Sequence, residues 1–375
     1  MLGFFAYLQA TLGPLMPFLR DELRLNYTVA GLHFSGFAFG MMLAGTSGER
    51  VAGWLGRKYL FWMSGLGMSL AGLLLTLGQS HWVTITSAFL MGFLGTFLAV
   101  MVQALLSDEQ GDKRGIALTE ANISASLFSL VAPLAIGFSP RIGLDWRLAL
   151  WLGVFIWVIV YALRFRTPIP KRKHVSTVDA KHTQPAKTSL PQSFTLYRII
   201  IFIGVSVEWC MIFWASDFLI TVAELQPDFA ATVMSIFFGA MLIGRTVGSM
   251  TLRRVATMPL LLMMVMLIVI GFPLFWLVDN VTLRIMGLFI IGFGMANLFP
   301  LGLAAASDAG SGDVDRASAR IAQAAGLAIL IAPQILAMLS DEWGIFRAYA
   351  ILPFLLSVLI IMILFTIYTE RSISL

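Results

Sequence analysis

Long apolar runs, separated by short polar or charged turns, occupy almost all of the 375-residue chain. A helix of about 20 apolar residues crosses the hydrocarbon core of a bilayer, which is about 30 Å thick. Since each run is about that long, the pattern predicts an all-α integral membrane protein with twelve transmembrane helices. The expected spans are residues 2–19, 29–48, 59–78, 83–106, 116–138, 148–165, 199–221, 230–250, 258–278, 284–305, 319–339 and 346–368.

The composition agrees with this pattern. Hydrophobic residues make up 59% of the chain and charged residues only 12%, whereas a soluble domain is about 25% charged. The net charge of +5 could indicate nucleic-acid binding, but the basic residues lie at the ends of the runs and in one polar break, and form no stripe with exposed aromatic residues. We therefore expect a lipid bilayer around the protein and no nucleic-acid partner. The single cysteine, Cys210, excludes a disulfide within the chain.

The longest polar break divides the runs into two groups of six. Residues 166–197 are rich in Pro, Ser, Thr and Lys and have no helical periodicity, which is typical of a flexible linker. The predicted organisation is an N-terminal half at residues 1–165, this linker, and a C-terminal half at residues 198–375.

Basic residues are unequally divided between the two membrane faces. If the N-terminus is cytoplasmic, 19 of the 25 Lys and Arg lie in the cytoplasmic turns, the linker and the tail. Cytoplasmic loops of membrane proteins carry such an excess, so we expect both termini and the linker on the cytoplasmic side of the plasma (inner) membrane. The six residues expected outside are Arg20, Arg24, Arg141, Arg147, Arg284 and Arg347.

The first run shows how the chain begins. No basic residue precedes it and no small-residue cleavage pattern follows, so residues 2–19 are predicted to be the first span and not a removable signal peptide. The polar lead that usually precedes a first span is missing, and we expect the start of the sequence to be shortened.

The two halves share a sequence repeat. Identities between apolar segments arise easily by chance, but polar pairs shared at one offset do not, so the halves are predicted to be two parallel copies of one six-helix unit. A shift of 200 residues superposes Gly92 on Gly292, Ser107-Asp108 on Ser307-Asp308, Ala132-Pro133 on Ala332-Pro333 and Arg147 on Arg347.

Two six-span halves joined by a basic linker resemble the major facilitator superfamily of secondary transporters, over essentially the whole chain. Residues 13–31 (GPLMPFLRDELRLNYTVAG) are similar to the end of that family's first span and the loop after it, and residues 144–152 (LDWRLALWL) to the start of its sixth. The resemblance implies two halves that rock around a central cavity.

The family's signature after the second span is present with changes. It comprises a Gly, an Asp-Arg pair and a Gly-Arg-Arg/Lys group; residues 45–58 have Glu for the Asp and carry the last group four residues late. Residues 244–254 repeat the signature without the acid. The resemblance implies a gating role for the matching residues Gly45, Glu49, Arg50, Arg57 and Arg245. Proton-driven drug exporters of the superfamily carry an Arg in the fourth span where this chain has Ala88, which disfavours that subclass.

Few polar side chains lie within the spans, and Glu208 is the foremost site candidate. A charge at the bilayer centre costs on the order of 3 kcal/mol or more, so such groups normally face the bundle interior or a wet cavity. Glu208 lies near the middle of the seventh span, the depth of substrate and coupling-ion sites in this architecture. Removal from water favours the neutral form of a carboxyl group, so Glu208 can exchange a proton as its exposure alternates. The alternative is a hydrogen-bonded Glu208 that fixes helix packing.

Two further acids have different expected environments. Asp217 follows Glu208 by nine residues, which places it on the opposite side of a straight helix. It also nears the outer surface, so we expect hydration or a helix-end hydrogen bond there. Glu120 lies about one turn inside the cytoplasmic edge, where pairing with Arg57 or Arg245 in a gate is favoured over solute binding.

Neutral groups complete the candidate site. Asn122 begins a polar stripe on the fifth span that either contacts a solute or joins helices. Trp209 can stack on a ring of the solute, although packing or lipid contact is favoured. Gln9, Asn297 and Gln323 can hydrogen-bond a solute, with helix-to-helix bonds as the alternative.

The combined prediction is a monomeric secondary active transporter that moves a small organic solute by alternating access, driven by the proton gradient without a cofactor. The four His are too scattered for a metal or catalytic cluster, and no phosphate-binding loop indicates coupling to ATP. No enzyme activity is therefore expected. One deep acid without a deep cation favours neutral or cationic solutes. The alternatives are a passive facilitator and a transporter-like membrane sensor or lipid-handling protein.

Overall fold

The computed structural model describes residues 1–167, 192–309 and 314–373, and these are helical apart from short turns. Apolar runs form helices because a backbone in lipid must satisfy its hydrogen bonds within its own segment. The helices are α1 (Leu2–Leu23), α2 (Tyr27–Leu55), α3 (Arg57–Leu77), α4 (His81–Gln110), α5 (Arg114–Arg141), α6 (Leu148–Arg164), α7 (Gln192–Ala223), α8 (Pro227–Thr251), α9 (Thr257–Trp276), α10 (Val281–Met295), α11 (Leu298–Ala309), α12 (Val314–Trp343), α13 (Ile345–Ala348) and α14 (Ile351–Ile373), with a 3-10 turn at Gly111–Lys113.

These helices form twelve spans. Within the described residues, 11 helical stretches are long and apolar enough to cross a membrane, and α6 is a shorter apolar helix of 17 residues. α10 and α11 together make one span, interrupted at Ala296 and Asn297, and α13 and α14 make the last one. The predicted all-α fold with twelve transmembrane helices is confirmed.

Several helices extend beyond the predicted spans. α2 runs to Leu55, and α7 begins at Gln192, inside the stretch predicted to be a linker. Hydropathy detects the part of a helix that lies in hydrocarbon, whereas backbone hydrogen bonds continue into the polar interface. Asn26 and Asn280 cap the starts of α2 and α10 with their side chains. Within the predicted linker, residues 168–191 lie outside the described residues.

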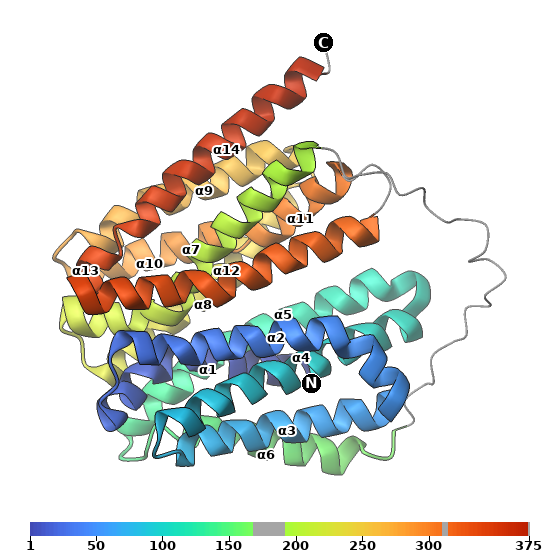
Figure 1. The fold of residues 1–375 in the computed structure, drawn as a ribbon, viewed down its shortest axis with the longest axis vertical. Helices are drawn as coiled ribbons and strands as arrows, with labels where there is room; N and C mark the ends of the chain where they lie inside the picture. The colour runs from blue at the N-terminus through green and yellow to red at the C-terminus, as the bar shows by residue number, and fades with distance from the viewer. Residues whose placement is uncertain (168–191, 310–313, 374–375) are drawn as a thin grey trace.

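Figure 1 shows the helices in two bundles, with α1 to α6 in the lower part of the view and α7 to α14 in the upper part. We call the side where α6 ends and α7 begins the linker side, at the right of the figure. The opposite helix ends define the far side, at the left. All six arginines expected outside lie at far-side helix ends or turns: Arg20, Arg24, Arg141, Arg147, Arg284 and Arg347.

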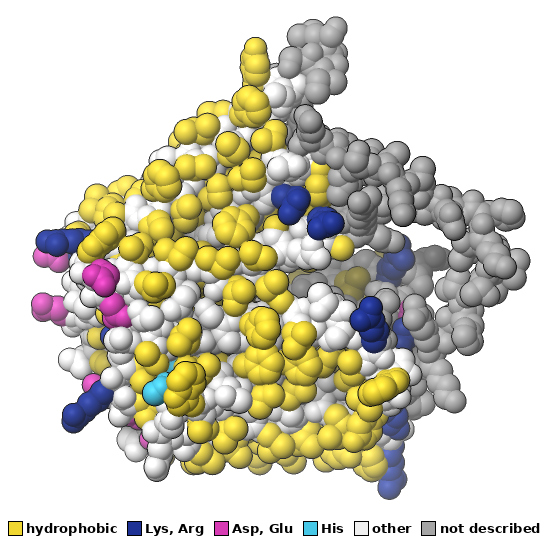
Figure 2. Space-filling view, viewed as in Figure 1, with side chains coloured by type: hydrophobic (Ala, Val, Ile, Leu, Met, Phe, Trp, Pro, Cys, Tyr) yellow, Lys and Arg dark blue, Asp and Glu magenta, His cyan; other side chains and the backbone are white. Residues whose placement is uncertain are grey.

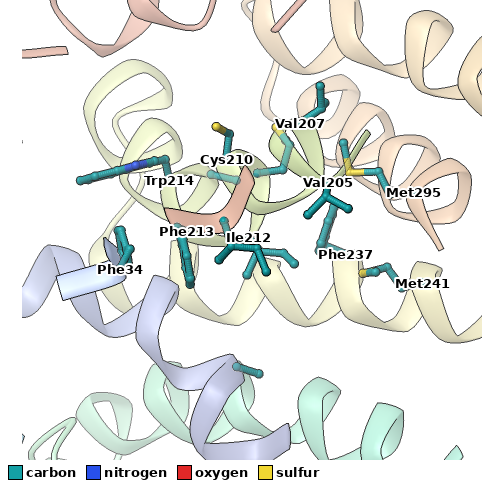
Figure 3. Packing of buried hydrophobic residues seen from close by; sticks show 14 of the residues in the cluster. Phe34, Val205, Val207, Cys210, Ile212, Phe213, Trp214, Phe237, Met241 and Met295 are labelled. Atoms are coloured by element: carbon teal, nitrogen blue, oxygen red, sulfur yellow. The ribbon is translucent and has the colours of Figure 1, made fainter. Parts of the chain in front are cut away.

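α1 and α7 are the central helices, and their side chains are buried almost throughout. Toward the far side, aromatic rings of α7 pack against the other half (Figure 3). Phe34 of α2 stacks on Phe213 with ring centroids 4.0 Å apart and meets Trp214 edge-on at 5.1 Å. Aromatic pairs of this kind add roughly 0.5–1.5 kcal/mol beyond the apolar area they bury. The two bundles are therefore held together by apolar contacts at that end.

The outer surface of the bundles is apolar. In Figure 2, hydrophobic side chains cover the visible face of both bundles, and most of the acidic side chains in view lie at the far-side edge. Exposed residues of this kind include Phe155 at 63% and Ile361 at 60% relative exposure. A soluble monomer rarely exposes so large an apolar area, so this surface fits the lipid-facing band of a membrane protein.

The 200-residue repeat also recurs in helix contacts. Gly92 of α4 lies against the Phe37 carbonyl of α2, and Gly292 of α10 lies against the Phe237 carbonyl of α8. A side chain at either glycine would overlap that carbonyl oxygen. Small residues let membrane helices approach this closely, so the same glycine contact joins the same pair of helices in each half.

We expect Gly92→Ala and Gly292→Ala each to lower the stability of the fold. The added methyl group meets a backbone carbonyl, and overpacking of this kind costs about 1–3 kcal/mol. The apparent melting temperature of the detergent-purified protein measures the effect.

Gly53→Ala on α2 is the matched control, since an added Cβ meets open space there. Alanine is also the better helix former by about 1 kcal/mol, so this variant should melt no lower than the parent. Equal melting temperatures for all three variants would contradict the close approach.

Candidate functional site

A cavity of about 120 Å³ lies between the two halves, near the middle of the central helices. One wall comes from α1 and α5 and the other from α7 and α8. Its apolar lining includes Ile212 and Met241, both labelled in Figure 3. The polar residues that line it are Gln9, Ser126, Ser129, Glu208, Trp209 and Arg245.

Glu208 is the only acid among the described residues that line this cavity. Its side chain is 8% exposed, and no hydrogen bond to its carboxylate is formed by any residue that the structure describes. Burying an ionised carboxylate without a partner is costly, so this group requires a proton or a cation. Its predicted place at mid-span therefore coincides with a cavity at the interface of the two halves.

Arg245 reaches the same cavity from α8. Its Nη1 donates a hydrogen bond to the Ser126 hydroxyl of α5 at 2.8 Å, which joins the two halves on the linker side of the cavity. Arg245 and Glu208 interact electrostatically, yet none of the ion pairs between described residues joins them. The sequence predicted a deep acid without a deep cation. α8, which flanks α7, brings the guanidinium of Arg245 to the cavity, but Arg245 is an exposed residue and not a buried one.

Two more predicted site residues line the cavity beside these charges. Gln9 of α1 lies opposite α7, and its amide has no hydrogen-bond partner within the described part of the chain. Trp209 packs edge-on against Phe213, with ring centroids 5.0 Å apart. Ser129 of the predicted polar stripe also lines the cavity. The structure thus brings Gln9, Glu208 and Trp209 together.

Three other predicted site residues lie outside the cavity. Asn122 is exposed, and its amide donates to the Leu118 carbonyl of its own helix at 2.8 Å. Gln323 is exposed on α12 beside Arg320. Asn297 is buried at the break between α10 and α11 and donates to the Gly244 carbonyl at 2.7 Å. This last bond is a helix-to-helix contact, the alternative that the sequence left open.

The predicted gate residues are spread over the linker side. Gly45 and Arg50 are exposed on α2, and the side chain of Glu49 lies outside the described residues. Arg57, at the start of α3, forms an ion pair with Asp108 at the end of α4, within one half. Arg245 lines the cavity between the halves.

The expected pairing of Glu120 with Arg57 or Arg245 is not formed. Glu120 is exposed on α5, whereas Arg57 contacts Asp108 and Arg245 contacts Ser126. Both arginines therefore have other partners. Depth in the membrane was readable from the sequence, but the direction of each side chain was not.

A buried ion pair joins the two halves on the far side. Arg20 of α1 donates through Nη1 to both carboxylate oxygens of Asp217 on α7, at 2.6 and 2.7 Å. The Arg20 guanidinium also lies 3.7 Å from the ring centroid of Tyr27, whose hydroxyl is 3.4 Å from Asp217. Asp217 is only 2% exposed. Of the two environments expected for this acid, hydration is wrong because α1 and α2 cover that side of α7. Asp217 instead forms hydrogen bonds near the far-side end of α7.

Further polar contacts on the far side cross between the halves. The Asp341 carboxylate of α12 accepts from the backbone N–H groups of Tyr27 and Thr28 at 2.8 and 2.7 Å. Arg141 of α5 pairs with Asp228 of α8 at 2.7 Å. We call these bonds, with the Arg20–Asp217 pair, the far-side contacts. In the sequence, these contacts were indicated only by residues of opposite charge at the same depth in the membrane. Several other pairs of residues also met that condition, so the sequence did not identify the partners.

Comparison with known proteins agrees with this geometry. The family model of the Major Facilitator Superfamily matches residues 1–309. No curated protein sequence matches the chain. Similar solved structures include a D-xylose-proton symporter, with TM-score 0.78 and 14% identity over 97% of this chain and 95% of that one.

Two other solved structures share the fold. A variant of the nucleoside transporter NupG has TM-score 0.78 and 12% identity over 97% of this chain and 98% of that one. A bacterial homolog of the human lysosomal transporter Spinster, in an inward-facing and occupied conformation, has TM-score 0.73 and 12% identity over 99% and 95%. The family and these folds indicate a membrane transporter of small solutes rather than an enzyme. The match over residues 1–309, the twelve-span fold and the cavity between two repeated halves agree: the chain belongs to the Major Facilitator Superfamily.

Proposed function

We propose that this protein is a secondary active transporter that couples the movement of a small organic solute to the proton gradient, with Glu208 as the coupling group. The observation that carries the proposal is the position of Glu208, a buried carboxylate without a hydrogen-bond partner among the described residues, in a cavity lined by both halves. A group at this place changes its access from one membrane face to the other when the halves rock.

The mechanism follows from the contrast between the two sides of the cavity. On the far side, two ion pairs and the bonds of Asp341 hold the halves together. On the linker side of the cavity, the polar contact between the halves within the described part of the chain is the bond from Arg245 to Ser126. This arrangement corresponds to the state of alternating access that is closed on the far side and opens toward the linker side.

We further propose the orientation and assembly. The arginines of the far side are few, and Lys and Arg gather on the linker side, so the linker and both termini are placed in the cytoplasm of a cell with this protein in its plasma (inner) membrane. One chain supplies both walls of the cavity, so a monomer is sufficient for transport. No cofactor is needed, because the proton gradient supplies the free energy.

Glu208→Gln should abolish solute accumulation driven by a pH gradient but retain solute exchange at solute concentrations that saturate the variant. Glutamine keeps the size and hydrogen-bonding capacity of protonated glutamate but cannot release a proton. Uptake of radiolabelled solute into proteoliposomes, with and without an imposed pH gradient, measures both activities. Glu109→Gln is the matched control, since this exposed acid at the end of α4 lies outside the cavity.

Unchanged uphill transport by the Glu208→Gln variant would contradict the proposal that this carboxyl group couples transport to protons. Parent protein that equilibrates its solute without ever accumulating it would instead indicate a passive facilitator.

Asp217→Asn should shift the protein toward the state open on the far side. Removal of one partner of a buried ion pair costs about 3–5 kcal/mol, so the population of that state should rise roughly tenfold or more. Spin labels at Leu77→Cys and Leu277→Cys, in a Cys210→Ala background, report the far-side distance between halves. Both leucines are exposed, at 61% and 56%, at the far-side ends of α3 and α9.

Asp145→Asn is the control for this measurement. Asp145 pairs with Arg147 within the N-terminal half and is 55% exposed, so its loss should leave the distance distribution as it is. An unchanged distribution in the Asp217→Asn variant would show that the buried pair does not hold the far side closed.

A further inference from the structure

The central cavity contains two opposite charges that do not neutralise each other directly. Glu208 and Arg245 are the only charged residues among the described ones that line it. The Arg245 guanidinium donates instead to the Ser126 hydroxyl at 2.8 Å, and no ion pair to Glu208 is formed within the described part of the chain. Opposite charges in a medium of low dielectric attract strongly. Two that face one cavity without contact leave room for a group between them.

Both charges belong to the same half. Glu208 lies on α7 and Arg245 on α8, so rocking of one half against the other leaves their spacing unchanged. The opposite wall, from α1 and α5, supplies neutral hydrogen-bonding groups: Gln9, Ser126 and Ser129. The C-terminal half thus supplies a carboxylate and a guanidinium at a constant spacing. The N-terminal half supplies neutral amide and hydroxyl groups that can donate or accept hydrogen bonds to a bound solute.

We infer that this cavity binds a small zwitterionic organic solute, with its cationic nitrogen at the Glu208 carboxylate and its anionic group at the Arg245 guanidinium. The inference rests on the proposed transport function and names the substrate class of that site. A singly charged solute leaves either the buried Glu208 carboxylate or the exposed Arg245 guanidinium without an ionic partner, and the cost is largest for the buried carboxylate. A zwitterion satisfies both charges with charge-assisted hydrogen bonds.

Size and aromatic lining agree with such a solute. The cavity has a volume of about 120 Å³. A cavity of this size favours a small solute. Trp209 lies directly beside Glu208 in the chain and also lines the cavity, and an indole face attracts organic cations. The cationic end of the solute therefore meets both a carboxylate and an aromatic ring.

Binding of matched solutes to the purified protein tests the inference. Each series keeps one carbon skeleton and varies the charge: β-alanine, propionate and propylamine; 5-aminopentanoate, pentanoate and pentylamine; phenylalanine, phenylpropionate and phenethylamine. Uridine and xylose serve as uncharged polar solutes. Calorimetric titration should find a zwitterion that binds roughly tenfold or more tightly than both singly charged analogues of its series, because a hydrogen bond to a charged group is worth that factor or more.

Two variants test which protein charge binds the cationic end of the zwitterion and which binds its anionic end. Glu208→Gln should weaken zwitterion binding roughly ten- to hundredfold and leave the binding of the matching anion unaffected or improved. Arg245→Gln should weaken the zwitterion similarly and spare the matching amine. Glu109→Gln and Arg254→Gln make the same changes at exposed positions outside the cavity and should bind like the parent.

A singly charged or uncharged solute as the tightest ligand in every series would overturn the inference. So would equal losses for anion, amine and zwitterion in each variant, which would indicate a general loss of the site. Uptake driven by a pH gradient separates the two proposals. A zwitterion that binds but is not accumulated contradicts proton coupling alone, whereas accumulated uridine or xylose supports transport and contradicts the zwitterion.

Discussion

The free-energy cost of removing a charged side chain from water determines where charges lie in this protein. Several kcal/mol are lost when an ion enters a medium of low dielectric without a partner, and most charges accordingly lie at the ends of the helices. Among the described residues, two places between the helices hold charges: the Arg20–Asp217 pair, and the cavity with the buried Glu208 and the exposed Arg245. Both places lie between the two halves, so the charges are tied to the surface along which the halves must move.

The buried carboxylates of these two places are stabilised in different ways. Asp217 is satisfied by a guanidinium, a tyrosine hydroxyl and a threonine hydroxyl, all within the folded chain. Glu208 has no such bonds to the described residues and depends on a proton or on a bound group. The first arrangement stabilises one state of the halves, and the second makes the stability of each state depend on what the cavity holds. A transporter needs both, since a ligand shifts an equilibrium only through its different affinity for the two states.

The two halves share their helix packing, but only the C-terminal half contributes charged residues to the cavity. Helix packing is common to both bundles, because each contains the same close contact between a glycine and a phenylalanine carbonyl. The charged positions of the cavity are not common to both. The 200-residue shift places Leu8 at the position that matches Glu208, and Gly45 at the position that matches Arg245. One wall of the cavity therefore has an acidic and a basic residue, and the other wall has neutral amide and hydroxyl groups.

The sequence by itself determined the twelve spans, the two repeated halves and the depth of Glu208. These follow from hydropathy and helical periodicity, which are properties of one segment at a time. The tertiary structure alone decided that Asp217 meets Arg20, that Arg245 enters the cavity, that Asn297 binds the Gly244 carbonyl and that Arg57 pairs with Asp108 instead of Glu120. Those outcomes depend on the rotation and tilt of each helix against its neighbours, and local periodicity does not encode them.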